Sequence, residues 1–212
     1  MKLSTLAFIA ALTPSLGFAA AHTSMTMAQT HMGHVTESWA DTPDAAGLLP
    51  TAIAEAEIAI FHAGLAAQKL DDLGWMKTHA NHILHAIDPS AIANGPGLGY
   101  GVLAGAAGTV KHINFAAGSE DASENIKIHA EHVATSAGNV VATVVAIKAN
   151  IATIEAAATA AAAAEATQAN VILTADLLDG ADANGDGVVD WTDGGLNEAM
   201  KHMGIMAAGE GM

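Results

Sequence analysis

One segment constrains the fold of this chain more than any other, a run of small and aliphatic residues from Val140 to Ala166. Its branched side chains recur mostly at helical spacing, at Val141, Val144, Val145, Ile147, Ile151 and Ile154. Ala156 to Ala166 is almost pure alanine, the strongest intrinsic helix former. No alternation typical of a strand reaches a useful length elsewhere in the sequence. We therefore predict an all-α protein, most simply a four-helix-type bundle.

The composition limits both the core and the function. Aromatic residues make up only 4% of the 212 residues, so the core must consist of Ala, Val, Ile and Leu on closely packed helices. Seven basic residues, all lysine, face 22 acidic ones, and the net charge of −15 excludes nucleic acid as a partner. The lack of cysteine excludes disulfides, cysteine zinc sites, iron–sulfur clusters and covalently attached haem.

The sequence predicts four domains or segments along the chain. Residues 1–21 have the properties of a Sec signal peptide, with Lys2 before an apolar run and small residues at Ala19 to Ala21. We expect a periplasmic or secreted protein without a stable membrane span. Residues 22–48 are rich in His and Met and are predicted to be flexible. Residues 49–166 are predicted to form the bundle, and residues 167–212 a separate C-terminal unit tethered by the polyalanine segment.

Within the predicted bundle, Gly and Pro mark the ends of the helices. We expect helices over 50–73, 75–87 and 101–117, and a further helix from residue 122 that Gly138 and Asn139 bend or divide. Residues 88–100 hold two prolines and three glycines and are predicted to form a loop.

Residues 182–193 place oxygen-bearing side chains at alternating positions of a twelve-residue stretch. The side chains that can ligate a cation are Asp182, Asn184, Asp186, Asp190 and Asp193. Val188 would add its backbone carbonyl, and Gly187 lies where the stretch must turn sharply. Calcium prefers six to eight such oxygens. A solvated acidic turn is the alternative, but its carboxylates would repel one another without a cation.

This stretch resembles the calcium loop of EF-hands and the related loop of dockerin modules. The resemblance implies one Ca²⁺ ion bound by Asp182, Asn184, Asp186, Val188, Asp190 and Asp193, within a helix–loop–helix unit. It covers about thirty residues. The usual last ligand of an EF-hand is Glu, so Asp193 implies weaker binding, and a dockerin normally carries two such loops where this chain carries one.

Eleven histidines are many for such a chain, and two pairs stand out. His79 and His82 form one His-x-x-His pair, and His129 and His132 form another. Residues three apart lie on the same side of a helix, so two facing pairs would surround one Zn²⁺ or copper ion. The alternative is that these histidines are ordinary polar surface residues.

The segment after the predicted signal adds His22 and further His and Met residues. Signal cleavage after Ala19 or Ala21 would place His22 third or first in the mature chain, where its ring and the terminal amine can chelate Cu(II). A flexible leader with no metal is the alternative.

These observations favour an exported calcium-binding protein. A periplasmic copper- or zinc-handling protein and a calcium-stabilised docking module are the alternatives. No acid–base pair or nucleophile of an enzyme is legible, and the protein partner is unknown.

Overall fold

The computed structural model describes residues 25–212, which form an all-α bundle of seven α-helices. The helices are α1 (Met27–Thr36), α2 (Leu48–Ala67), α3 (Leu73–Ile87), α4 (Val102–Gly118), α5 (Glu124–Ala156), α6 (Ala160–Asp179) and α7 (Leu196–Gly209). A short 3-10 helix, η1 (Pro43–Ala45), lies between α1 and α2. The prediction of an all-α bundle is confirmed.

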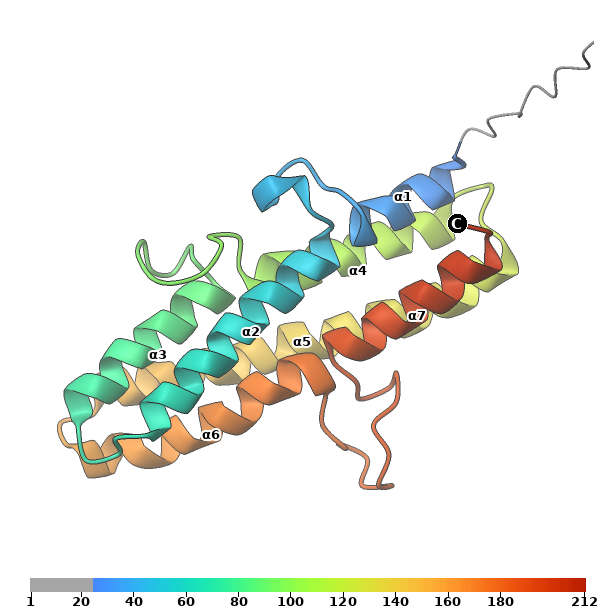
Figure 1. The fold of residues 1–212 in the computed structure, drawn as a ribbon. Helices are drawn as coiled ribbons and strands as arrows, with labels where there is room; N and C mark the ends of the chain where they lie inside the picture. The colour runs from blue at the N-terminus through green and yellow to red at the C-terminus, as the bar shows by residue number, and fades with distance from the viewer. Residues whose placement is uncertain (1–24) are drawn as a thin grey trace, which may run out of the picture.

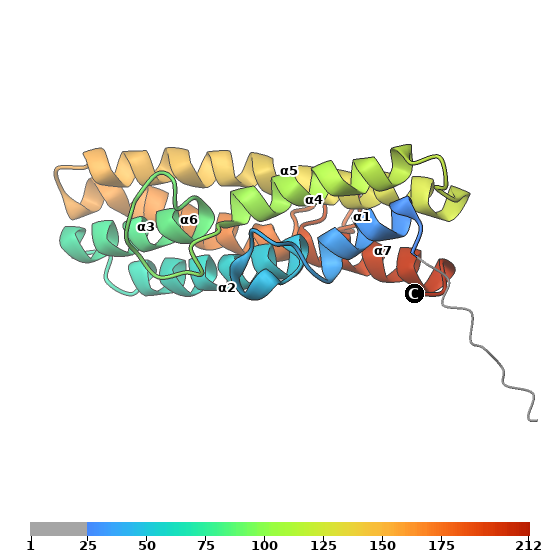
Figure 2. The ribbon, with the colours of Figure 1, turned by 90° about the horizontal axis from the view of Figure 1, so that it is seen from above.

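The bundle is elongated, and α5 runs along its whole length (Figures 1 and 2). At one end α5 lies with α2, α3 and α6, and at the other with α1, α4 and α7. The four-helix arrangement therefore occurs twice, end to end, with α5 common to both halves.

Side-chain caps define where several helices begin. Asp72 accepts a hydrogen bond from the N–H of Trp75 at the start of α3, and Ser123 accepts one from Ile126 at the start of α5. The bend or division predicted at Gly138 and Asn139 does not occur, because α5 continues through both residues without interruption. The neighbouring helices pack against α5 on both sides of this point, and their contacts outweigh the low helix propensity of a single glycine.

Residues 27–36 form helix α1, so the predicted flexibility of segment 22–48 is wrong for this part of it. A capping box joins Thr26 and Gln29, and Met32 and Val35 are fully buried. Asp121 accepts hydrogen bonds from the N–H groups of Met27 and Ala28, which attaches the start of α1 to the loop before α5. Capping and burial together order a segment whose composition suggested disorder.

The predicted boundary at residue 166 also needs correction, because it falls within α6. Ala163 and Leu177, on either side of it, both belong to the common core. The polyalanine segment is thus not a tether: it contains the end of α5, a break at residues 157–159 and the first turns of α6, so the helix predicted through it is divided there. Alanine allows close helix approach, which explains how it packs without large side chains.

A buried acid, Glu55, organises the loop between α3 and α4. Glu55 is fully buried, and its carboxylate accepts hydrogen bonds from the N–H groups of Leu98, Tyr100 and Gly101. The predicted loop at 88–100 is therefore held against α2.

Two helices, α2 and α5, are long and apolar enough to cross a membrane by length and composition alone. The same is true of core helices in many soluble bundles, so this finding is weak evidence for a membrane span.

Candidate metal centres

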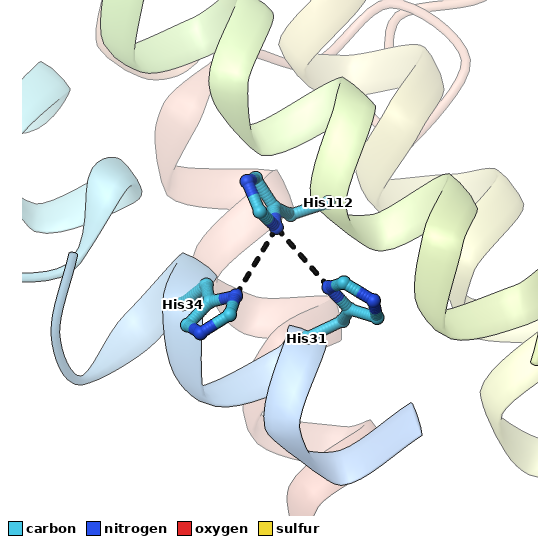
Figure 3. Close-up of side chains that lie close together, drawn as sticks. All are labelled: His31, His34 and His112. Carbon is cyan, nitrogen blue, oxygen red and sulfur yellow. Dashed lines mark hydrogen bonds between the residues drawn. The ribbon is translucent and has the colours of Figure 1, made fainter. Parts of the chain in front are cut away.

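Nine of the histidines gather into three clusters of three, each formed by a His-x-x-His pair on one helix and a single histidine on another. The α1–α4 cluster is His31, His34 and His112; the α2–α3 cluster is His62, His79 and His82; the α5–α7 cluster is His129, His132 and His202. Figure 3 shows how the pair of the α1–α4 cluster points toward His112.

The geometry repeats in detail. In every cluster the Nδ1 atom of the single histidine faces the Nδ1 atoms of both members of the pair. These nitrogen–nitrogen distances are 3.2 and 3.2 Å at His112, 2.9 and 3.3 Å at His62, and 3.0 and 3.3 Å at His202. Nitrogens bound at 2.0–2.1 Å to one tetrahedral or trigonal ion lie about 3.3–3.6 Å apart. Two sides of each nitrogen triangle thus come within a few tenths of an ångström of the spacing around one ion, and all three nitrogens lie within 4.8 Å of one another.

Hydrogen bonding alone does not satisfy three nitrogens in this arrangement. A neutral imidazole has one N–H group and one lone pair, so the Nδ1 atom of His112 can donate to or accept from one neighbour at a time. The other neighbour then faces it without a complementary partner. A cation between the three nitrogens would satisfy all of them.

The surroundings of the single histidine in each cluster favour its neutral form, which is the form that binds metal. Burial lowers the pKa of His62 to about 4, and the nearby His82 and His79 add to the effect. Burial lowers the pKa of His112 to about 4 as well, with contributions from His34 and His31. The pKa of His202 is also lowered, chiefly by burial, although the carboxylate of Glu198 opposes the shift. Protons therefore compete weakly with a metal at neutral pH.

Each of the three tryptophans of the chain lies against one cluster. The Trp39 ring is 4.5 Å from the His112 ring, the Trp75 ring 4.3 Å from His79, and the Trp191 ring 4.2 Å from His132, measured between centroids. Trp191 stacks nearly parallel to its imidazole, at 22°, whereas the other two are inclined by about 60°. Each cluster is therefore three imidazoles bounded by an indole.

Carboxylates take no part in the clusters among residues 25–212, since each group of mutually close ligand atoms there consists of histidine alone. Glu198 Oε1 lies 3.3 Å from Nε2 of His202, the nitrogen that points away from the cluster. This is the usual place for an outer carboxylate that orients a metal-binding histidine.

The predicted site at His79, His82, His129 and His132 is not formed. The structure assigns His79 and His82 to one cluster and His129 and His132 to another, and each pair is completed by a histidine on a different helix. Two of the three pairs were identified from the sequence, but the single histidines that complete the clusters, His62, His112 and His202, were not. His31 and His34 lay in the segment that was predicted to be flexible.

A repeat in the sequence gives part of the missing information. Moving His62, His79 and His82 along the chain by 50 residues places them on His112, His129 and His132. In the first copy the three residues form one cluster. In the second copy they separate. His112 on α4 faces α1, and His129 and His132 on α5 face α7.

The acidic loop at 182–193 lies between α6 and α7, where the sequence predicted it. The carboxylate of Asp182 accepts hydrogen bonds from the N–H groups of Gly185, Asp186 and Gly187. Gly185 and Gly187 have φ angles of 76° and 85°, which favour glycine. Asp193 accepts N–H groups from both ends of the loop, at Ala183 and Asp190.

The loop differs from the histidine clusters in how its ligands are used. Its carboxylates bind the N–H groups of the loop, and in the described part of the chain they do not form a group of mutually close ligand atoms. Val188, the predicted carbonyl ligand, is exposed. His22 and the predicted signal peptide lie outside the described residues.

Comparisons with models of protein families, with curated proteins and with solved structures find no match for this chain. The geometry of the clusters and of the loop must therefore carry the functional argument.

Proposed function

We propose that this protein binds transition-metal ions at three separate three-histidine sites, one in each cluster. The observation that carries the proposal is the threefold recurrence of one arrangement, in which a single Nδ1 atom faces two others at 2.9–3.3 Å. Surface histidines without a role have no reason to converge three times. Imidazole ligands suit copper, zinc, nickel and cobalt ions.

Binding and handling of metal fits the clusters better than catalysis does. A catalytic metal site needs an open position beside groups that act as acid or base. The clusters are bounded by indole rings, and their own residues offer only imidazoles. The expected export to the periplasm or beyond belongs to the same proposal, as that would be where such a protein meets these ions.

The test is the metal content of the untagged protein. Titration with Zn²⁺ or copper should reach three ions per chain. His62→Ala, His112→Ala and His202→Ala should each lower this to two, with the affinity of the altered site reduced more than about a hundredfold, beyond the usual effect of losing an outer-shell partner.

The matched control is His85→Gln. His85 is buried like the others, but it contacts the carbonyl of Pro96 and belongs to no cluster. This variant should still bind three ions. A parent protein that binds no ion, or that loses all three ions in every single variant through unfolding seen by circular dichroism, would contradict the assignment.

A second proposed function is calcium binding at 182–193. It rests on the resemblance of the loop to EF-hands and on the backbone around Asp182, whose carboxylate is held by three N–H groups. The first ligand is thus already positioned before an ion enters. We expect affinity on the order of 10⁻⁵–10⁻³ M, because the loop ends in Asp193 and not in Glu.

Calorimetry tests this second function. Asp182→Ala should abolish the heat of calcium binding, and Asp44→Ala, which removes an acid of the η1 segment outside the loop, should leave it unchanged. Equal binding by Asp182→Ala and the parent would reject the loop as the site.

A further inference from the structure

The indole beside each cluster bears on which ion the clusters hold. All three tryptophans of the chain are used in this way, and they come from different elements: Trp39 follows α1, Trp75 lies in α3, and Trp191 lies in the acidic loop. No common local sequence explains their placement. Their shared feature is contact with a histidine of a cluster, at 4.2–4.5 Å between ring centroids.

A Zn²⁺ ion at such a site lacks a ligand. Zinc in proteins is almost always four-coordinate, and a three-histidine site normally leaves its fourth position to water or substrate. Here three imidazoles are available, carboxylates are absent from the ligand groups of the described chain, and an aromatic ring stands beside the ligands. An indole ring is a poor ligand for a divalent ion, so it does not complete the coordination of Zn²⁺.

A monovalent, polarisable ion fits the same surroundings. Cu(I) can be coordinated by three nitrogen ligands without a fourth. Because its charge is lower, its desolvation beside an apolar ring costs less free energy than that of Zn²⁺. The face of an indole attracts cations within about 6 Å of its centre, and Trp provides the strongest such interaction among the side chains. Because Trp191 stacks on His132, an ion bound in the imidazole plane would lie about 5 Å from the centre of the indole.

We propose that the three clusters are Cu(I) sites, each with three imidazole ligands and an indole as the fourth wall. This inference rests on the proposed function and adds to it the oxidation state and the role of Trp39, Trp75 and Trp191. The tryptophans are positioning and selecting residues here, and the histidines remain the ligands.

The experiment compares Cu(I) with Zn²⁺ on the full chain and on two variants that replace all three tryptophans. Trp→Leu at positions 39, 75 and 191 keeps an apolar wall but removes the ring. Trp→Phe at the same positions keeps a ring with a weaker attraction for cations. Cu(I) affinity is measured by competition with a chromophoric chelator under a reducing agent, and Zn²⁺ affinity by competition with a zinc chelator.

The parent should bind three Cu(I) ions more tightly than three Zn²⁺ ions, with quenching of indole fluorescence on Cu(I) addition. The leucine variant should lose about tenfold in Cu(I) affinity at each site, and the phenylalanine variant less, whereas Zn²⁺ affinity should stay within about twofold or rise. Unchanged helical circular dichroism will show that the variants are folded; if the triple variants do not fold, the same comparison is made on Trp191→Leu, which changes only a loop residue.

Two results would overturn the inference and leave the proposed function standing. One is tighter binding of Zn²⁺ than of Cu(I) by the parent. The other is an equal loss of Cu(I) and Zn²⁺ affinity in the leucine variant, which would make the tryptophans merely structural. Failure of the parent to bind either ion would instead reject the three-histidine sites themselves.

Discussion

The α2–α3 and α5–α7 clusters each consist of three histidines, but they are built from very different parts of the chain. In the α2–α3 cluster every element is local: α2 and α3 are joined by a short turn, and Trp75 lies one helical turn before His79. In the α5–α7 cluster the ligands come from segments some seventy residues apart, and the indole comes from the acidic loop. The ligand triangle is thus repeated while its surroundings vary. Differences between the two clusters should therefore reveal what the surroundings contribute.

The largest expected effect is that of metal removal on stability. Ions that bind only the folded chain stabilise it by about 4 kcal/mol per site when present at a thousand times the dissociation constant. We expect a chelator to lower the thermal midpoint strongly. Amide exchange should rise most in α1 and α7, because their clusters fasten terminal helices, and less in the α2–α3 pair. An equal rise of amide exchange in α1, in α7 and in the α2–α3 pair would show that the ions do not hold α1 and α7 in place.

A smaller effect is expected from acid on the metal-free protein. The folded-state pKa values of His62 and His112 are lowered to about 4 from a reference of 6.5, so the unfolded chain binds more protons between these values. The contribution of these two histidines to the free energy of unfolding should be fully present above about pH 6.5 and should fall as the pH drops toward 4. Below about pH 4 it should change little.

Variants separate the histidines from the carboxylates that titrate in the same range. His62→Gln should flatten the pH dependence of the unfolding free energy more than His202→Gln does, because Glu198 opposes the shift at His202. Identical pH profiles for the parent and both variants would show that the histidines do not carry the acid sensitivity.

The two kinds of site differ in how much of them the sequence predicts. The acidic loop is contained in twelve consecutive residues, and its position between two helices follows from its own pattern. The His-x-x-His pairs are equally local, and two of the three were predicted. Their third ligands were not, because the choice of partner depends on which helix packs beside which, and this depends on side-chain packing across the whole bundle.

The same distinction explains the errors in the fold. Helix α1 was predicted as flexible because its order comes from Asp121, in a loop some ninety residues away, and from burial of Met32 and Val35. The all-α class was predictable because helical spacing is a local property. The boundary between the bundle and the C-terminal unit was not predictable, because α6 packs in the bundle and also leads directly into the acidic loop.

A further difference between the clusters is the carboxylate of Glu198, 3.3 Å from Nε2 of His202. Outer-shell carboxylates orient metal-binding histidines and raise their basicity, and their loss costs about 10–100-fold in affinity. Glu198→Gln should weaken the α5–α7 site by about tenfold and leave the α2–α3 site unchanged. Metal titrations with and without Glu198→Gln would resolve the sites in two backgrounds: His62→Ala with His112→Ala, which leaves the α5–α7 site, and His112→Ala with His202→Ala, which leaves the α2–α3 site. Equal affinities would mean that the Glu198 contact has no influence on the metal.

The smallest effect we expect connects the acidic loop to one cluster only. Trp191 lies between the proposed calcium ligands Asp190 and Asp193, and its ring stacks on His132. The loop is also attached to α5 beyond His132, since Ser136 donates a hydrogen bond to the carbonyl of Trp191 and Asn139 donates to that of Thr192. An ion in the loop that shifts Asp190 and Asp193 must therefore move or fix the indole against the α5–α7 cluster.

We predict that calcium changes the metal affinity of this cluster by a few-fold, near the lower limit of typical coupling between sites, and that the metal changes calcium affinity by the same factor. The α2–α3 cluster, whose Trp75 is part of α3, should not respond. Titrating the metal with and without millimolar calcium, in the parent and in Asp182→Ala, measures the coupling. A response that persists in Asp182→Ala, or that appears equally at the α2–α3 cluster, would show that calcium acts elsewhere and that Trp191 does not couple the two sites.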